Sequence, residues 1–131
     1  KPTLAAAKDI YKQAGITNPM KEIHLAQVHD CFTMTELLTY EDLGFIPKGS
    51  ASEHITNGTF ALDGELPVNT DGGLKTFGHP TGATGVRMIY ENVLQLQGRA
   101  GARQVKSATM ALSHNLGGAP QTCGLAILGI E

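Results

Sequence analysis

The order of patterned segments along this chain predicts an α/β fold in which helices flank a mixed β-sheet. The segments follow one another as helix, strand, helix, a long irregular stretch, helix and two strands. The last two strands are almost continuously apolar, which favours strands covered on both faces. A length of 131 residues with 41% hydrophobic residues fits one domain, residues 1–131, with a core of its own.

The first helix and the first strand come early in the chain. Pro2–Ala14 is predicted as a helix, because Pro2 suits a first turn and Gly15 suits the position after the last one. Its apolar face at helical spacing comprises Leu4, Ala7, Ile10 and Tyr11. Ile23–His29 alternates and then becomes apolar, which indicates a partly buried strand.

A second helix is predicted over Met34–Asp42. Thr33 would cap it, Glu36 three residues later would complete a capping box, and Gly44 would end it. The segment His29–Phe32, reading HDCF, therefore lies between the end of a strand and the start of a helix. Ligands gather at that edge of open α/β sheets, so this tetrapeptide is a candidate site.

Two irregular segments lie in the middle of the chain. Phe45–Thr70 is long and poorly periodic apart from a short helical stretch at Ala51–Asn57, and we expect it to cover or shape a site. Asn69–Gly85, reading NTDGGLKTFGHPTGATG, contains five glycines. Because glycine lets the backbone approach another group closely, this segment is predicted to form the wall of a site.

The C-terminal part contains the most strongly patterned helix and the two apolar strands. Ala83–Gln97 is predicted as a helix that Gly98 ends. Its apolar stripe comprises Val86, Ile89, Tyr90, Val93, Leu94 and Leu96. Ala108–His114 and Thr122–Ile130 are predicted as strands, joined by a turn that reads LGGAPQ.

His79 is the best candidate for a catalytic base. Gly78 and Pro80 fix its backbone and leave the ring uncovered, and a helix begins a few residues later. A helix N-terminus favours the neutral imidazole, which is the form that takes a proton from a thiol. For each histidine of the chain, a hydrogen-bonded or solvated structural residue stays the ordinary alternative.

Cys31 is the candidate thiol, because a position at a helix N-terminus lowers a thiol pKa. Phe32 would form one wall of its pocket. Cys123 lies within an apolar strand, where a cysteine usually serves as a small core hydrophobe. The segment His114–Gly118, reading HNLGG, has two interpretations: a turn that ends a strand, or a loop whose polar groups point at a substrate oxygen.

Composition and motifs argue against several classes of function. A net charge of -2 without a basic patch gives no support for nucleic-acid binding, and no apolar run approaches the ~20 residues of a membrane span. The sequence has no CxxC or HxxxH pair for zinc and no Lys-Ser/Thr ending of a P-loop. Two distant cysteines do not suggest a disulfide framework, so we expect a reducing compartment, the cytoplasm.

Three motifs in this order resemble the C-terminal half of thiolases, most closely the sterol-carrier-protein-type thiolases and their bacterial and archaeal relatives. They are HDCF at His29–Phe32, GHPTGATG at Gly78–Gly85 and HNLGG at His114–Gly118. The resemblance covers essentially the whole chain, and GHPxGATG is its most specific part.

This resemblance implies half of a five-layered α-β-α-β-α fold that is built from two similar halves. Thiolases cleave a 3-oxoacyl-CoA with coenzyme A or run the reverse Claisen condensation, so both compounds would be substrates, with no metal and no covalently bound cofactor. His79 would activate the nucleophilic cysteine and help bind the thioester oxygen, and His29 would hold the other part of that oxyanion hole, often through a water. Cys31 would protonate or deprotonate the substrate α-carbon. The acyl pocket and the second oxyanion site would be bordered by His114, Asn115, Gly117 and Gly118.

The sequence departs from the thiolase pattern in two respects. Many thiolases carry the acid/base cysteine in a CxG turn before the last strand, whereas here HNLGGAPQ occupies that place and Cys123 follows it. Cys123 is therefore only a second choice for the acid/base. No N-terminal half with a nucleophilic cysteine is present, so we expect a fragment or one subunit of a homo- or hetero-oligomer, incomplete alone.

Two alternative functions stay open. Thiolase-like chains also act as retro-aldolases or acyltransferases together with a zinc-ribbon and OB-fold partner. A second alternative is a module that only binds acyl-CoA without catalysis. A nucleophilic cysteine in the other half would favour a thiolase, and its absence would favour an aldolase.

Overall fold

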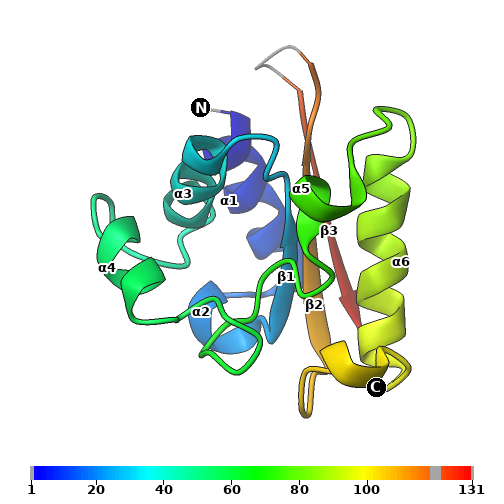
Figure 1. Cartoon of the computed structure of the whole chain (residues 1–131). Helices are drawn as coiled ribbons and strands as arrows, with labels where there is room; N and C mark the ends of the chain where they lie inside the picture. Colours follow the sequence, from blue (N-terminus) through cyan, green and yellow to red (C-terminus); the bar gives the residue numbers. More distant parts are fainter. Residues whose placement is uncertain (1, 119–121, 131) are drawn as a thin grey trace.

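The computed structural model describes residues 2–118 and 122–130, which form a three-layered arrangement of helices, sheet and helix (Figure 1). In the sheet, β1 (Leu25–Val28) pairs in parallel with β2 (Met110–Leu116), and β2 pairs antiparallel with β3 (Cys123–Gly129). The predicted α/β fold with a mixed sheet is confirmed.

Helices cover both faces of this sheet. Figure 1 shows α1 (Pro2–Ala14) and α3 (Thr33–Asp42) on one side and α6 (Thr84–Leu96) on the other. The remaining helical elements are α2 (Pro19–Glu22), α4 (Ala51–Thr56), α5 (Gly73–Phe77) and a 3-10 turn at Gly101–Arg103. Of these, only α4 was expected, because helices of three to five residues show no periodicity in the sequence.

The strands begin and end at other residues than predicted. β1 is shorter than Ile23–His29, while β2 starts two residues later than Ala108 and continues through Leu116. β2 is the central strand, as predicted, but β3 lies at the edge of the described sheet and is only partly buried. Residues 119–121 of the predicted turn lie outside the described residues.

The predicted capping box at the start of α3 is wrong. Phe32 occupies the N-cap position with φ -135° and ψ 149°, and Thr33 is already the first helical residue. The Glu36 carboxylate instead accepts a hydrogen bond from the Tyr40 hydroxyl at 2.6 Å. Gly44 follows the end of α3 with a φ of +73°, as expected for a left-handed residue after a helix.

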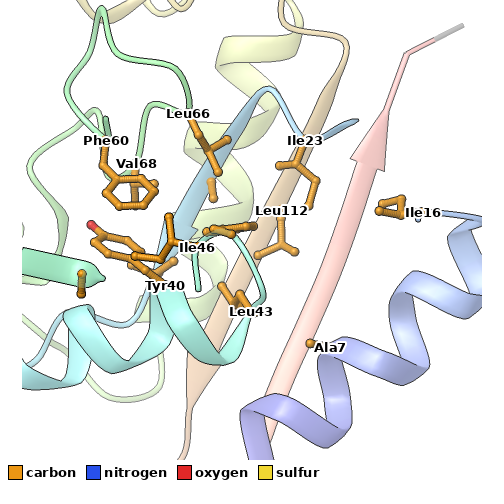
Figure 2. Close-up of a cluster of buried hydrophobic side chains, with 14 residues drawn as sticks. Ala7, Ile16, Ile23, Tyr40, Leu43, Ile46, Phe60, Leu66, Val68 and Leu112 are labelled. Carbon is orange, nitrogen blue, oxygen red and sulfur yellow. The ribbon is translucent and has the colours of Figure 1, made fainter. Parts of the chain in front are cut away.

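The main hydrophobic core lies between β1, β2, α1, α3 and the segment Phe45–Thr70 (Figure 2). Tyr40 of α3 stacks on Phe60 of that segment with ring centroids 3.9 Å apart. Val68 forms a parallel bridge with Ala26 of β1. The expectation that Phe45–Thr70 shapes a site is therefore wrong, because the segment packs into the core and none of its residues lines the cavity at the carboxyl end of β1.

Two predicted helix faces differ from the observed ones. In α6, Val86 and Tyr90 are 70% and 62% exposed, whereas the polar residues Glu91, Asn92 and Gln95 are buried. In α1, Leu4 is exposed and Thr3 is buried in its place. Polar residues join apolar ones such as Met88 and Ala7 on these buried faces, because their side chains hold loops and buried groups by hydrogen bonds.

Candidate active site

A single open cavity of about 780 Å³ brings the three sequence motifs together. It lies where β1 and β2 end, beside the start of α3 and the glycine-rich loop. Because the two strands are parallel, their carboxyl ends meet at one edge of the sheet. Its lining includes the predicted residues His29, Cys31, Phe32, His79, Asn115, Gly117 and Gly118. Further lining comes from α1 and α3, mainly Thr3, Thr35, Leu38 and Thr39.

The imidazole rings of His29 and His79 contact each other in this cavity. Their centroids lie 4.9 Å apart, and the rings meet edge to face at 89°. His29 is buried, while His79 is exposed on the loop before α6. The Nδ1 atom of His79 lies 2.6 Å from the Thr84 hydroxyl oxygen. Two imidazoles from distant motifs thus face one space.

His29 is held by the last residues of β2. Its Nδ1 atom lies 2.8 Å from the side-chain oxygen of Asn115, and the backbone N–H of Leu116 points to the same nitrogen at 3.3 Å. These contacts exist because β2 continues two residues beyond His114. Asn115 therefore both contacts His29 and lines the cavity.

His114 does not line the cavity, which corrects its predicted place there. It is fully buried beneath the site, with Nε2 3.1 Å from the Thr3 hydroxyl oxygen. The backbone N–H of His29 donates to its Nδ1 at 3.4 Å. Burial, together with the nearby His29, lowers the pKa of His114 to about 4. A neutral ring with its hydrogen on Nε2 fits both contacts, so His114 supports the backbone of His29.

The two cysteines have different surroundings, and both are free thiols. Cys31 is partly buried and lines the cavity just before α3. Its sulfur lies 3.8 Å from the Thr35 hydroxyl oxygen. Cys123 is the first residue of β3 and is partly exposed, so it is not the core hydrophobe that was predicted. Burial raises the pKa of the Cys123 thiol, and this residue does not line the cavity.

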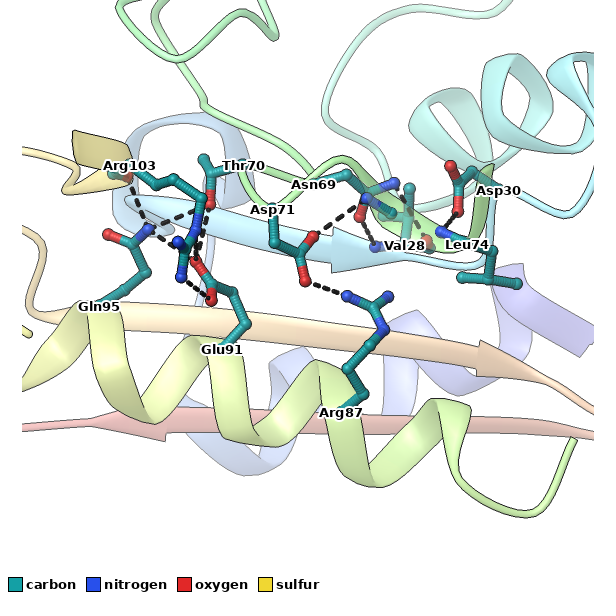
Figure 3. Close-up of polar contacts among 11 residues, drawn as sticks. Val28, Asp30, Asn69, Thr70, Asp71, Leu74, Arg87, Glu91, Gln95 and Arg103 are labelled. Carbon is teal, nitrogen blue, oxygen red and sulfur yellow. Dashed lines mark hydrogen bonds and ion pairs between the residues drawn. The ribbon is translucent and has the colours of Figure 1, made fainter. Parts of the chain in front are cut away.

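Hydrogen bonds and an ion pair hold the glycine-rich segment against the end of β1 and against α6 (Figure 3). The Asn69 side chain accepts from Val28 N–H at 2.8 Å and donates to Val28 C=O at 3.2 Å. The buried Asp30 carboxylate accepts from Leu74 N–H at 2.8 Å. The Asp71 carboxylate forms an ion pair with Arg87 of α6. These contacts fix the segment that leads to His79.

Further along α6, the buried Glu91 carboxylate connects the glycine-rich segment to the turn that follows the helix. Glu91 accepts from Arg103 at 2.9 Å and from Gln95 at 3.0 Å, and the Thr70 hydroxyl donates to it at 3.3 Å. Burial alone would raise the pKa of Glu91, but the hydrogen bonds from Arg103 and Gln95 lower it overall. The carboxylate therefore stays charged and bonded.

Sequence reasoning missed the residues that hold the site together. Asp30 lies inside the HDCF motif, in which the histidine and the cysteine were the candidate residues. The Asp71-Gly72-Gly73 turn was visible as a signal, but its partner Arg87 is distant in sequence. Only the fold pairs such residues.

Within residues 2–118 and 122–130, no group of three or more His, Cys, Asp or Glu side chains is placed to hold a metal ion. In the same ranges, no helix is both long and apolar enough to cross a membrane.

The layered fold and a cavity that joins two histidines and a thiol at one sheet edge define a thiolase-like domain. The chain belongs to the thiolase C-terminal domain-like family, whose model matches residues 1–130. This membership confirms the resemblance that the three motifs predicted.

Individual relatives agree with this family. An acetyl-CoA acetyltransferase of Methanothermobacter thermautotrophicus is 44% identical over 125 residues, which cover 95% of this chain and 32% of that protein. Human sterol carrier protein 2 is 44% identical over 112 residues, which cover 86% of this chain and 20% of that protein. A solved structure named Ltp2-ChsH2(DUF35) aldolase superposes with a TM-score of 0.82 at 33% identity, covering 97% of this chain and 31% of that one. The chain thus spans at most about a third of each relative.

Proposed function

We propose that this chain supplies half of the active site of an acyl-CoA thiolase, an acyltransferase acting on 3-oxoacyl-CoA. The observation that carries this proposal is the contact between His29 and His79, 4.9 Å apart at their centroids, in a cavity that Cys31 also lines. Claisen chemistry needs a base for a nucleophile, donors for a thioester oxygen and an acid/base for the α-carbon. At one sheet edge, His79 would serve as the base, His29 as the donor and Cys31 as the acid/base thiol.

In the cleavage direction, His79 takes the proton of a cysteine thiol that belongs to the other thiolase half. The thiolate attacks the 3-oxo carbon, the bond between the α-carbon and the β-carbon breaks, and the acyl group stays on that cysteine. Cys31 gives its proton to the α-carbon of the departing enolate. Coenzyme A then gives its thiol proton to the Cys31 thiolate, its sulfur takes the acyl group, and His79 returns the first proton.

His29 serves as a donor to the thioester oxygen in this scheme. That role needs a hydrogen on Nε2 and therefore a lone pair on Nδ1. The backbone N–H of Leu116, which points to Nδ1 at 3.3 Å, suits this form, and the Asn115 amide at 2.8 Å suits it when its NH2 group rather than its oxygen faces Nδ1. Asn115, Gly117 and Gly118 border the part of the cavity that would take the acyl group.

In this proposal the nucleophile belongs to a partner half, and the described domain exposes an apolar surface on which that half could pack. Val86 and Tyr90 lie one turn apart on α6 and expose apolar side chains, and Phe77, the last residue of α5 within the glycine-rich segment, is 60% exposed. Exposed apolar residues grouped beside a site indicate a covered surface in the assembled protein. We propose that the nucleophile-bearing half packs on this face of α6, in a homo- or hetero-oligomer.

The test is to co-express the chain with the N-terminal half of the archaeal acetyl-CoA acetyltransferase and to measure coenzyme A-dependent cleavage of acetoacetyl-CoA. We expect the assembled halves to be active. His79→Ala and Cys31→Ala should each lower kcat by about 100-fold or more, because each removes a proton-transfer group.

Co-purification of the two halves, measured for every variant, separates lost assembly from lost chemistry. His54→Ala is the control, since His54 lies on α4 and bonds to Thr59 away from the cavity. Unchanged turnover in Cys31→Ala would exclude Cys31 as the acid/base. Unchanged turnover in His79→Ala would exclude the proposed base.

An aldolase is the second candidate, because a solved relative at 33% identity and TM-score 0.82 is named an aldolase. In that case the chain would cleave a β-hydroxyacyl-CoA together with a partner subunit. The same assembled halves would then release an aldehyde or ketone without needing free coenzyme A. Product analysis with and without coenzyme A distinguishes the two reactions.

A further inference from the structure

Thr84, the first residue of α6, makes an unusually close contact with the proposed base. Its side chain is almost fully buried, at 1% exposed, although the loop before it is exposed. Its hydroxyl oxygen lies 2.6 Å from His79 Nδ1. The same hydroxyl is 3.2 Å from the backbone carbonyl oxygen of Pro80, to which it donates.

A threonine hydroxyl has one hydrogen to donate and two lone pairs that accept. With that hydrogen directed to the Pro80 carbonyl, the oxygen can only accept from His79. A neutral imidazole carries one hydrogen, on either Nδ1 or Nε2, and its other nitrogen holds a lone pair. In this arrangement the hydrogen of His79 lies on Nδ1 and Nε2 holds the lone pair.

The competing arrangement has the opposite consequence. The Pro80 carbonyl also accepts the backbone N–H groups of Ala83 at 2.8 Å and Thr84 at 3.0 Å. If these occupied it fully, the Thr84 hydroxyl would donate to Nδ1, and the imidazole hydrogen would lie on Nε2. That form has no lone pair on Nε2, so it could not take a proton there.

We propose that Thr84 is a positioning residue that holds His79 as the tautomer with hydrogen on Nδ1 and a basic Nε2. This inference rests on the proposed role of His79 as a base and adds the group that makes the base competent. It also explains why a threonine stands buried at the start of α6, where it does not act as an N-cap.

The tautomer can be measured without any activity. The full chain is labelled with ¹⁵N, and long-range ¹H–¹⁵N correlations of the His79 ring are recorded at a pH where the ring is neutral. We expect Nδ1 to give the signal of a protonated nitrogen and Nε2 that of an unprotonated one. A protonated Nε2 in the wild-type chain would overturn the proposal, whatever the reaction of the assembled protein.

Variants test whether Thr84 sets this tautomer. Thr84→Ser keeps the hydroxyl and should keep the wild-type signals. Thr84→Val keeps the shape but removes the hydroxyl, so Nε2 should become mainly protonated, as in free histidine. In the assembled halves, Thr84→Val should lower kcat by ten- to a hundredfold with little change in KM, and Thr84→Ser should restore most of it.

Thr56→Val is the matched control. Thr56 on α4 donates to the Ser52 carbonyl four residues earlier at 2.9 Å but contacts no histidine. It should change neither the His79 signals nor kcat. Identical His79 signals in wild type and a folded Thr84→Val would also overturn the proposal, and if that variant does not fold, the wild-type tautomer decides.

Discussion

At the scale of single residues, burial disfavours a charge on His114 beneath the site. Its ring accepts from the His29 backbone and lies against Thr3, and burial keeps its pKa near 4. A proton on Nδ1 would remove the acceptor for His29 N–H and place a charge beneath the cavity. The neutral ring is thus part of the structure that holds His29.

A pH dependence of stability follows from this lowered pKa. The unfolded chain binds a proton at this histidine below the ordinary value of 6.5, whereas the folded chain binds it only near 4. The free energy of unfolding should therefore fall as the pH drops from 6.5 towards 4, by up to about 1.4 kcal/mol per pH unit. Urea unfolding between pH 7 and pH 4 measures this slope.

The slope has to be assigned to His114 itself. His114→Gln removes the titrating group and should flatten the pH dependence relative to the wild-type chain. NMR titration gives a second reading that does not need this variant: the His114 ring should stay neutral well below pH 6. A ring that titrates near 6.5 in the folded chain would contradict the assignment.

At this scale the sequence motifs indicated candidate residues that line one cavity, but not which of two neighbours faces it. Histidine, cysteine and glycine motifs are local, so HDCF and GHPTGATG could be recognised directly. His114 and Asn115 are adjacent in a strand, and successive side chains of a strand point to opposite faces. The predicted strand ended at His114, which hid this alternation, whereas β2 continues through Leu116.

At the scale of elements, the short helix α5 depends on a close approach between Gly73 and Asp30. Gly73 has a φ of +64°, and a Cβ there would lie 2.8 Å from Asp30 Cγ and closer still to one carboxylate oxygen. Asp30 also accepts the N–H of the next residue, Leu74. The contact joins the loop of His29 to the segment that leads to His79.

Gly73→Ala should therefore destabilise the chain by about 2 kcal/mol or more, because it adds a clash with buried Asp30 to an unfavourable φ. Gly15→Ala is the matched control: Gly15 has a similar φ of +72° but no atom within 4 Å of a Cβ. It should cost about 1 kcal/mol. Equal losses in urea unfolding would show that the contact with Asp30 contributes nothing.

The limits of sequence reasoning at this scale appear in α6. Its helical pattern was correct, but the apolar stripe was assigned to the buried face. The buried side includes Leu96 of that stripe but also uses Glu91 and Gln95 to hold Thr70 and Arg103, which hydrophobic periodicity does not reveal. A buried polar face requires partners that lie elsewhere in the chain, so only the fold shows it.

At the scale of the whole molecule, the fold class was predictable because it follows from the order of elements, which the sequence pattern contains. The edge position of β3 was not, since its apolar residues resemble those of a covered central strand. The chain matches the family model over residues 1–130 and spans at most about a third of each longer relative, so the partly exposed strand β3 fits the proposed packing against another half. Apolar surface on one domain suits contact with another.

The exposed face of α6 is where this idea can be tested. Val86→Glu and Tyr90→Glu together place two charges on side chains that are 70% and 62% exposed here, so the chain alone should fold normally by circular dichroism. If the nucleophile-bearing half covers this face, the charges must be desolvated on assembly, and co-purification of the two halves should be lost. Ile55→Glu, at a 45% exposed position on α4, should leave co-purification intact. Undiminished co-purification of the double variant would contradict this placement. The partner half would then bind another surface of the chain and reach the cavity from another side.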